Sequence, residues 1–289
     1  MKNYYTAEEA IKRLAIPRST FYDRVKAGEI TRITVPLRKQ YLYPKAQIDQ
    51  LAEEKARILG ELEQPSRLAF VVPEYDDLVQ LVDIDRMIFH EETLILPEEQ
   101  QKRFAYNPEA MHVLKDTKTN TVLGGITLSP LKPSVLEKLI ELEIDETEIK
   151  PEDYQPFTAD HPQDCYIVGI VARPSLIETY YAGKLLRAAT EYLISLLDRG
   201  IIIRRIYTVA TTKQGDRLAQ SFHFTLLKAN LDVQNEEFRK SYVLNLEDAN
   251  NSSKLVKAYL QARKNMERRV KRYKKQAKRL SNDSKTDSN

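Results

Sequence analysis

Helix-stop signals divide the first sixty residues into segments that suit only a small, tightly turned module. Thr6 and Glu9 form a T-x-x-E capping box, in which each side chain satisfies an unpaired amide at a helix start. Pro17 ends that helix because proline disfavours helical geometry in the residue before it. A second helix, expected over 18–26, stops at Gly28, which suits a left-handed C-cap. The sequence therefore predicts two short helices joined by a turn.

A hairpin and a closing helix complete this module. The segments on either side of residues 36–39 have strand composition, and the turn between them holds Arg38 and Lys39. A helix with proline in its first turn follows. We expect the module to span 1–54 and a charged linker to span 55–66.

Five stretches of the module carry a recognisable pattern. They are Tyr5–Ala10, Leu14–Ile16, Arg18–Tyr22, Ala27–Ile30 and Tyr43–Lys45. Together with the order of elements, they resemble the MerR/excisionase family of winged helix-turn-helix domains. The resemblance implies that double-stranded DNA is the partner and that the second helix enters the major groove. A module that recruits a protein instead of DNA is the alternative reading.

The resemblance and the polarity of the second helix together indicate which residues contact DNA. Phe21 and Val25 are expected to pack inward, behind an outward polar face. The candidates on this helix are Arg18, Ser19, Thr20, Tyr22, Asp23 and, as a phosphate contact, Arg24. Arg38 and Lys39 are the candidates in the wing, where backbone contacts position the protein without reading sequence.

Positive charge is concentrated at the two ends of the chain. Residues 1–60 hold 12 lysines and arginines against 7 acidic residues, and 254–280 hold 12 against 1. The middle, 61–253, holds 20 against 32. This segregation indicates that the ends, and not the body, meet a polyanion.

The basic C-terminal segment is expected to form a helix over 251–280, followed by a disordered tail over 281–289. Its candidate DNA contacts are Arg268, Arg269 and Arg272. An ordinary solvated helix and a helix lying on an anionic membrane surface are the alternatives. The N-terminal module favours nucleic acid among the polyanions.

The segment 67–250 alternates strands and helices, with an acidic, proline-punctuated insertion over 132–162. An apolar strand over 166–172, of the kind buried on both faces, precedes a long amphipathic helix over 178–197. This order of elements resembles the GNAT acetyltransferase fold, which implies acetyl-CoA as a cofactor. The predicted fold class is α+β: a small winged helix-turn-helix domain, a GNAT-like mixed α/β domain and a basic C-terminal helix.

The sequence departs from that family at the positions that carry its chemistry. The family's Q/R-x-x-G-x-G/A loop cradles the pyrophosphate of acetyl-CoA on bare amides. Aligning Ala182 with the last small residue puts Tyr180 at the glycine and Ile177 at the Arg/Gln position. The tyrosine that the family often uses as general acid falls, counting back from Phe224, on Ala219. The residues that would hold acetyl-CoA, if it binds, are Val171, Ala172, Ala182, Gly183 and Lys184.

These departures favour a body without catalytic residues or a bound cofactor, which acts as a sensor, dimerisation or partner platform. The sequence predicts a cytoplasmic, nucleoid-associated transcriptional regulator that works as a homodimer or with a protein partner. Cys165 is the only cysteine, no membrane span is expected, and the four histidines lack metal-ligand spacing. Two alternatives stay open: an active acetyl-CoA-dependent N-acetyltransferase with a DNA-binding domain, and a structural nucleoprotein of a mobile element.

Overall fold

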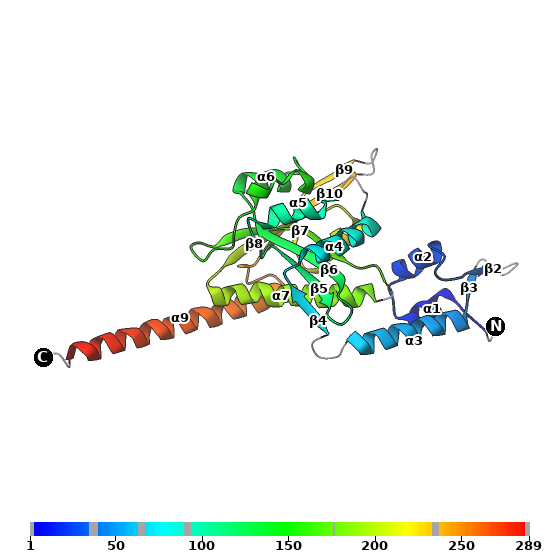
Figure 1. Cartoon of the computed structure of the whole chain (residues 1–289), viewed down its shortest axis with the longest axis horizontal. Helices are drawn as coiled ribbons and strands as arrows, with labels where there is room; N and C mark the ends of the chain where they lie inside the picture. Colours follow the sequence, from blue (N-terminus) through cyan, green and yellow to red (C-terminus); the bar gives the residue numbers. More distant parts are fainter. Residues whose placement is uncertain are drawn as a thin grey trace.

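The computed structural model describes residues 3–34, 40–62, 67–89, 94–175, 177–232 and 237–286. A small N-terminal module lies at one end of a larger body, and a long helix leaves the body at the opposite end (Figure 1). The module consists of β1 (Tyr4–Tyr5), α1 (Ala7–Leu14), α2 (Arg18–Lys26), β2 (Ile33–Thr34), β3 (Tyr41–Pro44) and α3 (Lys45–Leu62). Its three strands form an antiparallel sheet in the order β1-β3-β2.

The local signals read from the sequence are present in the module. Both hydrogen bonds of the Thr6–Glu9 capping box form at the start of α1. Gly28 follows α2 with a φ of +80°, a conformation that glycine adopts without a steric cost. The module's buried apolar side chains pack together as one cluster: Ala10, Leu14, Ile16, Phe21, Ile30, Tyr43, Ile48 and Ala52. The module therefore has a hydrophobic core of its own.

The closing helix is longer than the sequence predicts. The expected boundary at residue 54 falls inside α3, which continues to Leu62 through the first part of the predicted linker. Ile58 and Leu59 of this extension pack against a cluster of the body that includes Leu185. Burial of these two side chains explains why the helix continues where the sequence looks like a charged connector. The helix α3 thus joins the module to the body.

The body is built on one mixed sheet of seven strands. They are β4 (Leu68–Val71), β5 (Met111–Asp116), β6 (Thr121–Pro130), β7 (Gln163–Ala172), β8 (Ile203–Ala210), β9 (Thr225–Asp232) and β10 (Glu237–Asn245). The spatial order is β4-β5-β6-β7-β8-β10-β9, and every neighbouring pair is antiparallel except β7 with β8. The order of elements along the chain confirms the predicted fold class, with a GNAT-like mixed domain after the helix-turn-helix module.

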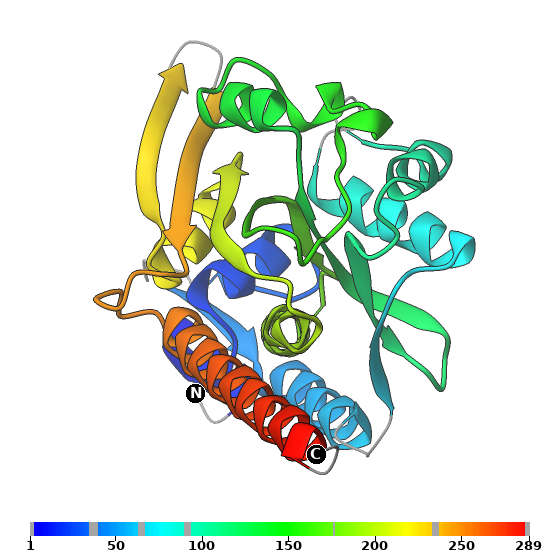
Figure 2. The same cartoon turned by 90° about the vertical axis from the view of Figure 1, so that its left-hand side faces the viewer.

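Helices cover both faces of this sheet (Figure 2). The helical elements are α4 (Tyr75–Ile88), α5 (Pro97–Phe104), α6 (Pro133–Ile140), η2 (Glu146–Glu148), η3 (Pro151–Asp153), α7 (Glu178–Leu196), η4 (Leu197–Arg199), α8 (Lys213–Ser221) and α9 (Lys254–Thr286). The helices α4 and α6 pack on one face, and α7 and α9 pack on the other. None of the described helices is long and apolar enough to cross a bilayer.

Two elements of the body have no counterpart among the sequence expectations. The helix α5 is strongly polar, and its buried residues are Gln100 and Arg103, so it lacks an apolar periodicity that sequence reading detects. The strand β9 lies at the edge of the sheet and exposes Leu226 and Leu227. The strand β7, predicted to be buried throughout, is buried only in its first half, and Gly169 is exposed.

The basic C-terminal helix starts on the body and then leaves it. Val256 and Tyr259 are fully buried against α7 and β8, and the Ile203 amide donates to the Tyr259 hydroxyl at 2.8 Å. The helix continues to Thr286, into the segment 281–289 that the sequence predicts to be disordered.

We expect a Tyr259→Phe variant to unfold more easily than the wild-type chain. The substitution leaves the buried Ile203 amide without its acceptor, which costs about 1–3 kcal/mol. Urea denaturation followed by circular dichroism measures the difference. Tyr273→Phe, at a position 71% exposed on the same helix, is the matched control and should change nothing. Equal stability of the Tyr259→Phe variant and the wild type would show that the hydroxyl does not anchor α9.

Candidate functional site

The helix α2 presents one polar face to solvent. Residues one helical turn apart on this face are exposed: Arg18, Ser19, Tyr22, Asp23 and Lys26. Phe21 is completely buried beneath them, with its ring edge-on to Tyr43 at 4.9 Å between centroids. This arrangement of outward polar side chains over a packed apolar residue is what entry into a major groove requires.

The start of α2 is suited to a phosphate. Pro17 precedes the helix, no side chain caps its first amides, and its first turn contains no acidic residue. Backbone amides at a helix start favour negative charge, and they are a common source of contacts to DNA phosphates. The guanidinium of Arg18 lies 5.8 Å from the centre of the Tyr22 ring, so these two side chains are held together at this end of the face.

Arg24 lies on the packed side of α2, in contrast to the sequence prediction. It follows Phe21 by three residues, so helical periodicity turns it inward, and its side chain is only 15% exposed. It forms an ion pair with Glu29. Thr20 is also partly buried. Lys26, which the sequence reasoning omitted, is exposed together with Tyr22 and Asp23.

The two wing candidates, Arg38 and Lys39, lie outside the described residues. In the adjoining part of the hairpin, the exposed guanidinium of Arg32 lies 4.7 Å from the Tyr41 ring centre. Sequence reasoning missed Arg32 because it considered only the turn, although a basic residue on the preceding strand was a visible signal. Arg32 is an additional candidate for contact with the DNA backbone.

The C-terminal half of α2 lies beside the first turn of α7. The charges of Arg24 and Asp23 both act on the carboxyl of Glu178, the first residue of α7. Burial raises the pKa of Glu178, Arg24 lowers it and Asp23 raises it further. The module is joined to the body by the packing of Ile58 and Leu59 of α3 against Leu185 of α7, and its charges at the end of α2 act on Glu178.

The parallel strands β7 and β8 separate half-way along the sheet. Their pairing ends with Ile167 opposite Thr208, although β7 continues to Ala172 and β8 to Ala210. A bulge at Val168 marks the point of separation, because Ile167 and Gly169 pair with consecutive residues of β6. We call this opening between β7 and β8 the fork.

The insertion fills one side of the fork with apolar side chains. Leu139, Ile149 and Tyr154 of the insertion pack against Tyr166 of β7 and Tyr207 of β8. Two arginines fasten the insertion in this position. Arg103 of α5 donates to the backbone oxygens of Glu146 and Thr147, and Arg239 of β10 donates to the backbone oxygens of Leu142 and Ile144.

A polar contact closes the fork itself. Tyr166 is fully buried, its hydroxyl donates to the carboxylate of Glu146, and the Val209 backbone of β8, beyond the last β7–β8 pair, acts on the same hydroxyl by lowering its pKa. Burial raises the pKa of Tyr166 well above its ordinary value, and Glu146 adds to the rise. A phenol with a raised pKa is a weaker proton donor. The sequence reasoning did not identify this pair.

The residues that would cradle a diphosphate do not fit one. The amides of Ile177 and Glu178 donate to the side chain and backbone of Ser175, and those of Tyr180 and Tyr181 donate to the Ile177 oxygen. These amides are therefore already bonded, and Glu178 adds an acidic side chain beside them. Ile177, at the position of the family's Arg or Gln, is buried in the core.

The other predicted cofactor residues are brought together only loosely. Val171, Ala172 and Ala182 are partly buried, Gly183 is exposed, and the ammonium of Lys184 lies over the Tyr180 ring at 5.1 Å. Ala219, at the general-acid position, is buried beside Tyr242. The arrangement does not fit acetyl-CoA.

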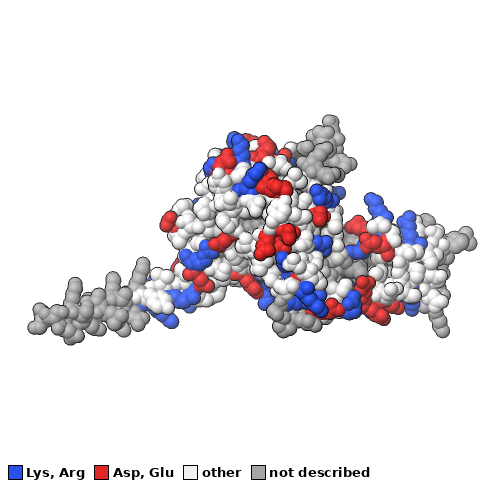
Figure 3. Space-filling view, in the orientation of Figure 1, with Lys and Arg blue, Asp and Glu red and all other residues white. Residues whose placement is uncertain are grey.

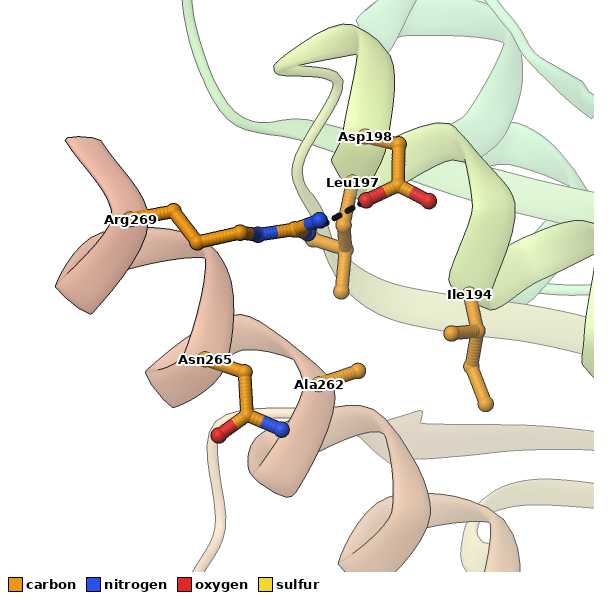
Figure 4. Close-up of a pocket in the computed structure, with 6 residues that line it drawn as sticks. All are labelled: Ile194, Leu197, Asp198, Ala262, Asn265 and Arg269. Atoms are coloured by element: carbon orange, nitrogen blue, oxygen red, sulfur yellow. Dashed lines mark hydrogen bonds and ion pairs between the residues drawn. The ribbon is translucent and has the colours of Figure 1, made fainter. Parts of the chain in front are cut away.

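A cavity of about 340 Å³ lies at the other end of α7, away from the fork (Figure 4). It is lined by Ile194, Leu197, Asp198, Ala262, Asn265 and Arg269. Within the part of the chain that the structure describes, no three histidine, cysteine or carboxylate side chains come together as a metal site. We therefore take the polar face of α2 as the candidate functional site.

A family model described as a helix-turn-helix domain matches residues 4–56, which contain α1, α2 and the hairpin. Residues 4–56 are a helix-turn-helix domain. No curated protein matches the sequence. The match ends inside α3, so the family model does not cover the body.

Several solved structures align with the body at low similarity. The loading GNATL domain of CurA from Lyngbya majuscula is 14% identical over 62% of this chain and 97% of that chain, with a TM-score of 0.46. An acetyltransferase of the GNAT family from Bacillus anthracis is 15% identical over 63% and 97%, with a TM-score of 0.39. NAA60 from Arabidopsis thaliana in complex with acetyl-CoA is 16% identical over 63% and 99%, with a TM-score of 0.41. At these identities the likeness concerns the fold of the body alone.

Proposed function

We propose that the chain is a transcriptional regulator that reads DNA with the exposed face of α2 and does not transfer acetyl groups. The observation that carries the proposal is the combination of this exposed polar face with a closed fork. The face offers an exposed cation, a hydroxyl and a carboxylate, which are groups that discriminate base edges. In the GNAT-like domain, the loop that would bind a diphosphate carries Ile177 and Tyr180, and the position of the proton donor carries Ala219, which has no proton to donate.

Useful affinity requires more surface than one such module buries. A single small DNA-binding module covers little of a duplex, and specific affinity usually comes from pairing two of them. We therefore propose that the chain acts as a homodimer or with a protein partner, in the cytoplasm and associated with the nucleoid. The body supplies the platform, and the electrostatic interaction of Glu178 with Arg24 and Asp23 of α2 gives it a route to influence DNA affinity.

We expect no saturable heat when acetyl-CoA is titrated into the full-length chain, and no release of coenzyme A in the presence of amines. The reason is that the α7 amides are already bonded and that Tyr166 and Glu146 close the fork. Isothermal titration calorimetry measures binding, and a thiol assay measures turnover. NAA60, solved with acetyl-CoA, serves as the positive control. Saturable binding with turnover would replace this proposal by the acetyltransferase alternative.

A further inference from the structure

The orientation of α9 about its own axis is fixed by its packing on the body. Val256 and Tyr259 are fully buried, and Met266 packs against the same cluster. One side of the helix therefore faces the body over its first three turns. Whatever lies on the opposite side is held outward and does not rotate freely.

The outward side of α9 carries cations that no carboxylate neutralises. We define the α9 basic face by the exposed residues Lys264, Arg268, Lys271 and Arg272. Their spacing of four, three and one places them on one side of a helix. Within the described part of the chain, no acidic side chain pairs with any of them.

The neighbouring arginines behave differently. Arg263 pairs with Glu247 and Glu267, and Arg269 pairs with Asp198 at the edge of the cavity in Figure 4. Arg269, a sequence candidate for DNA contact, is thus engaged with the body, whereas Arg268 and Arg272 remain free among the described groups. The body neutralises the inner cations of α9 and leaves the outer ones available.

The α9 basic face and the reading face of α2 lie at opposite ends of the molecule. The DNA-binding module is at one end of the long axis, and α9, about 50 Å long, leaves the body at the other (Figure 1). The segment 61–253 between them is acidic overall, and acidic side chains are spread over the body in Figure 3. An acidic surface repels a duplex that runs from one end to the other.

We propose that the α9 basic face is a second DNA-backbone site, which holds a duplex other than the one read by α2. Four cations distributed along one helical face suit a row of phosphates better than a single small anion. Contacts of these ammonium and guanidinium groups with phosphates carry no base information, so a backbone site takes any sequence. Binding of the first duplex by α2 rests on the proposed function, whereas binding of the second duplex by the α9 basic face does not depend on it.

A capture experiment tests the proposal with the full-length chain. A duplex that the chain prefers is immobilised, the chain is bound, and a labelled duplex of unrelated sequence is added. The wild-type chain is expected to capture the label. Replacing all four residues of the α9 basic face by glutamine should lower capture at least tenfold and change retention on the first duplex less than twofold. Capture through four phosphate contacts should also fall about 100-fold between 50 and 200 mM salt.

A matched variant separates the α9 basic face from charge in general. It carries glutamine at four exposed cations of the body, namely Lys102, Lys118, Lys138 and Arg187, and should capture the label as the wild type does. Undiminished capture by the α9 variant would overturn the proposal. The labelled duplex would then be held by the helix-turn-helix domain of a second chain in a dimer. Retention of the chain on vesicles of anionic phospholipid, with no capture of the labelled duplex, would also overturn it.

Failure of the first duplex has a different meaning. A chain that retains no preferred duplex contradicts the proposed function and leaves the α9 basic face to be measured alone. In that case the labelled duplex is titrated into the wild-type chain and the α9 variant by fluorescence anisotropy. Equal affinity and equal salt dependence for the wild-type chain and the α9 variant would overturn the proposal of a second DNA site.

Discussion

A chain with Arg18→Ala and Ser19→Ala loses sequence-selective DNA binding and stays folded. Both side chains are exposed on α2, so their removal leaves the core around Phe21 intact. Each lost base contact costs about 1–3 kcal/mol, and two of them weaken binding to the preferred site by roughly 30-fold or more. Binding to unrelated sequence should change far less, because it depends on backbone contacts. Fluorescence anisotropy with preferred and scrambled duplexes measures both affinities.

The matched control for this variant is Arg187→Ala. Arg187 is an exposed cation of α7 whose side chain is 76% accessible, and its removal lowers the net charge by the same amount. It should leave the ratio of preferred to scrambled affinity unchanged. If the Arg18 and Ser19 variant keeps its preference for the selected duplex, α2 is not the reading element.

The Phe21→Ala variant should unfold the helix-turn-helix domain and leave the body folded. Phe21 is 0% exposed and its ring packs edge-on against Tyr43, so truncation removes a large buried side chain from a small core. Such truncations cost about 3–5 kcal/mol, which a domain of this size does not tolerate well. Hydrogen exchange read by mass spectrometry should show lost protection in α1 and α2, with retained protection in β5 to β8.

Tyr41→Ala is the control for that experiment. Tyr41 belongs to the same module but is 42% exposed, so losing it should lower stability far less than losing Phe21. DNA binding should disappear in the Phe21 variant and persist in the control. Native protection of α2 in the Phe21 variant would mean that the body, and not the module's own core, holds the helix-turn-helix in shape.

Local signals in the sequence were sufficient for most of the helix-turn-helix domain. The Thr6–Glu9 box, Pro17 and Gly28 act over a few residues, so they set α1 and α2 without reference to the rest of the chain. Arg24 shows the limit of composition. Arg24 was expected to contact a phosphate, but its place three residues after Phe21 turns it to the packed side, whereas Lys26 is exposed.

Features that depend on distant parts of the chain were not predictable in the same way. The extension of α3 to Leu62 follows from the burial of Ile58 and Leu59 on the body, which no local pattern in a charged segment reveals. The contact of Tyr166 with Glu146 depends on the path of the insertion and on where β7 leaves β8. The loss of glycine at Tyr180 was visible in the sequence, whereas the closure of the fork was not.

Selection from a pool of random duplexes tests the central claim most directly. The full-length chain and the variant with Arg18→Ala and Ser19→Ala are each used to retain duplexes over several rounds, and the retained pools are sequenced. We predict one recurring motif in the wild-type pool, and no enriched motif in the variant pool. A wild-type pool as random as its input would contradict the assignment of α2 as a sequence-reading element, and with it the proposed regulator.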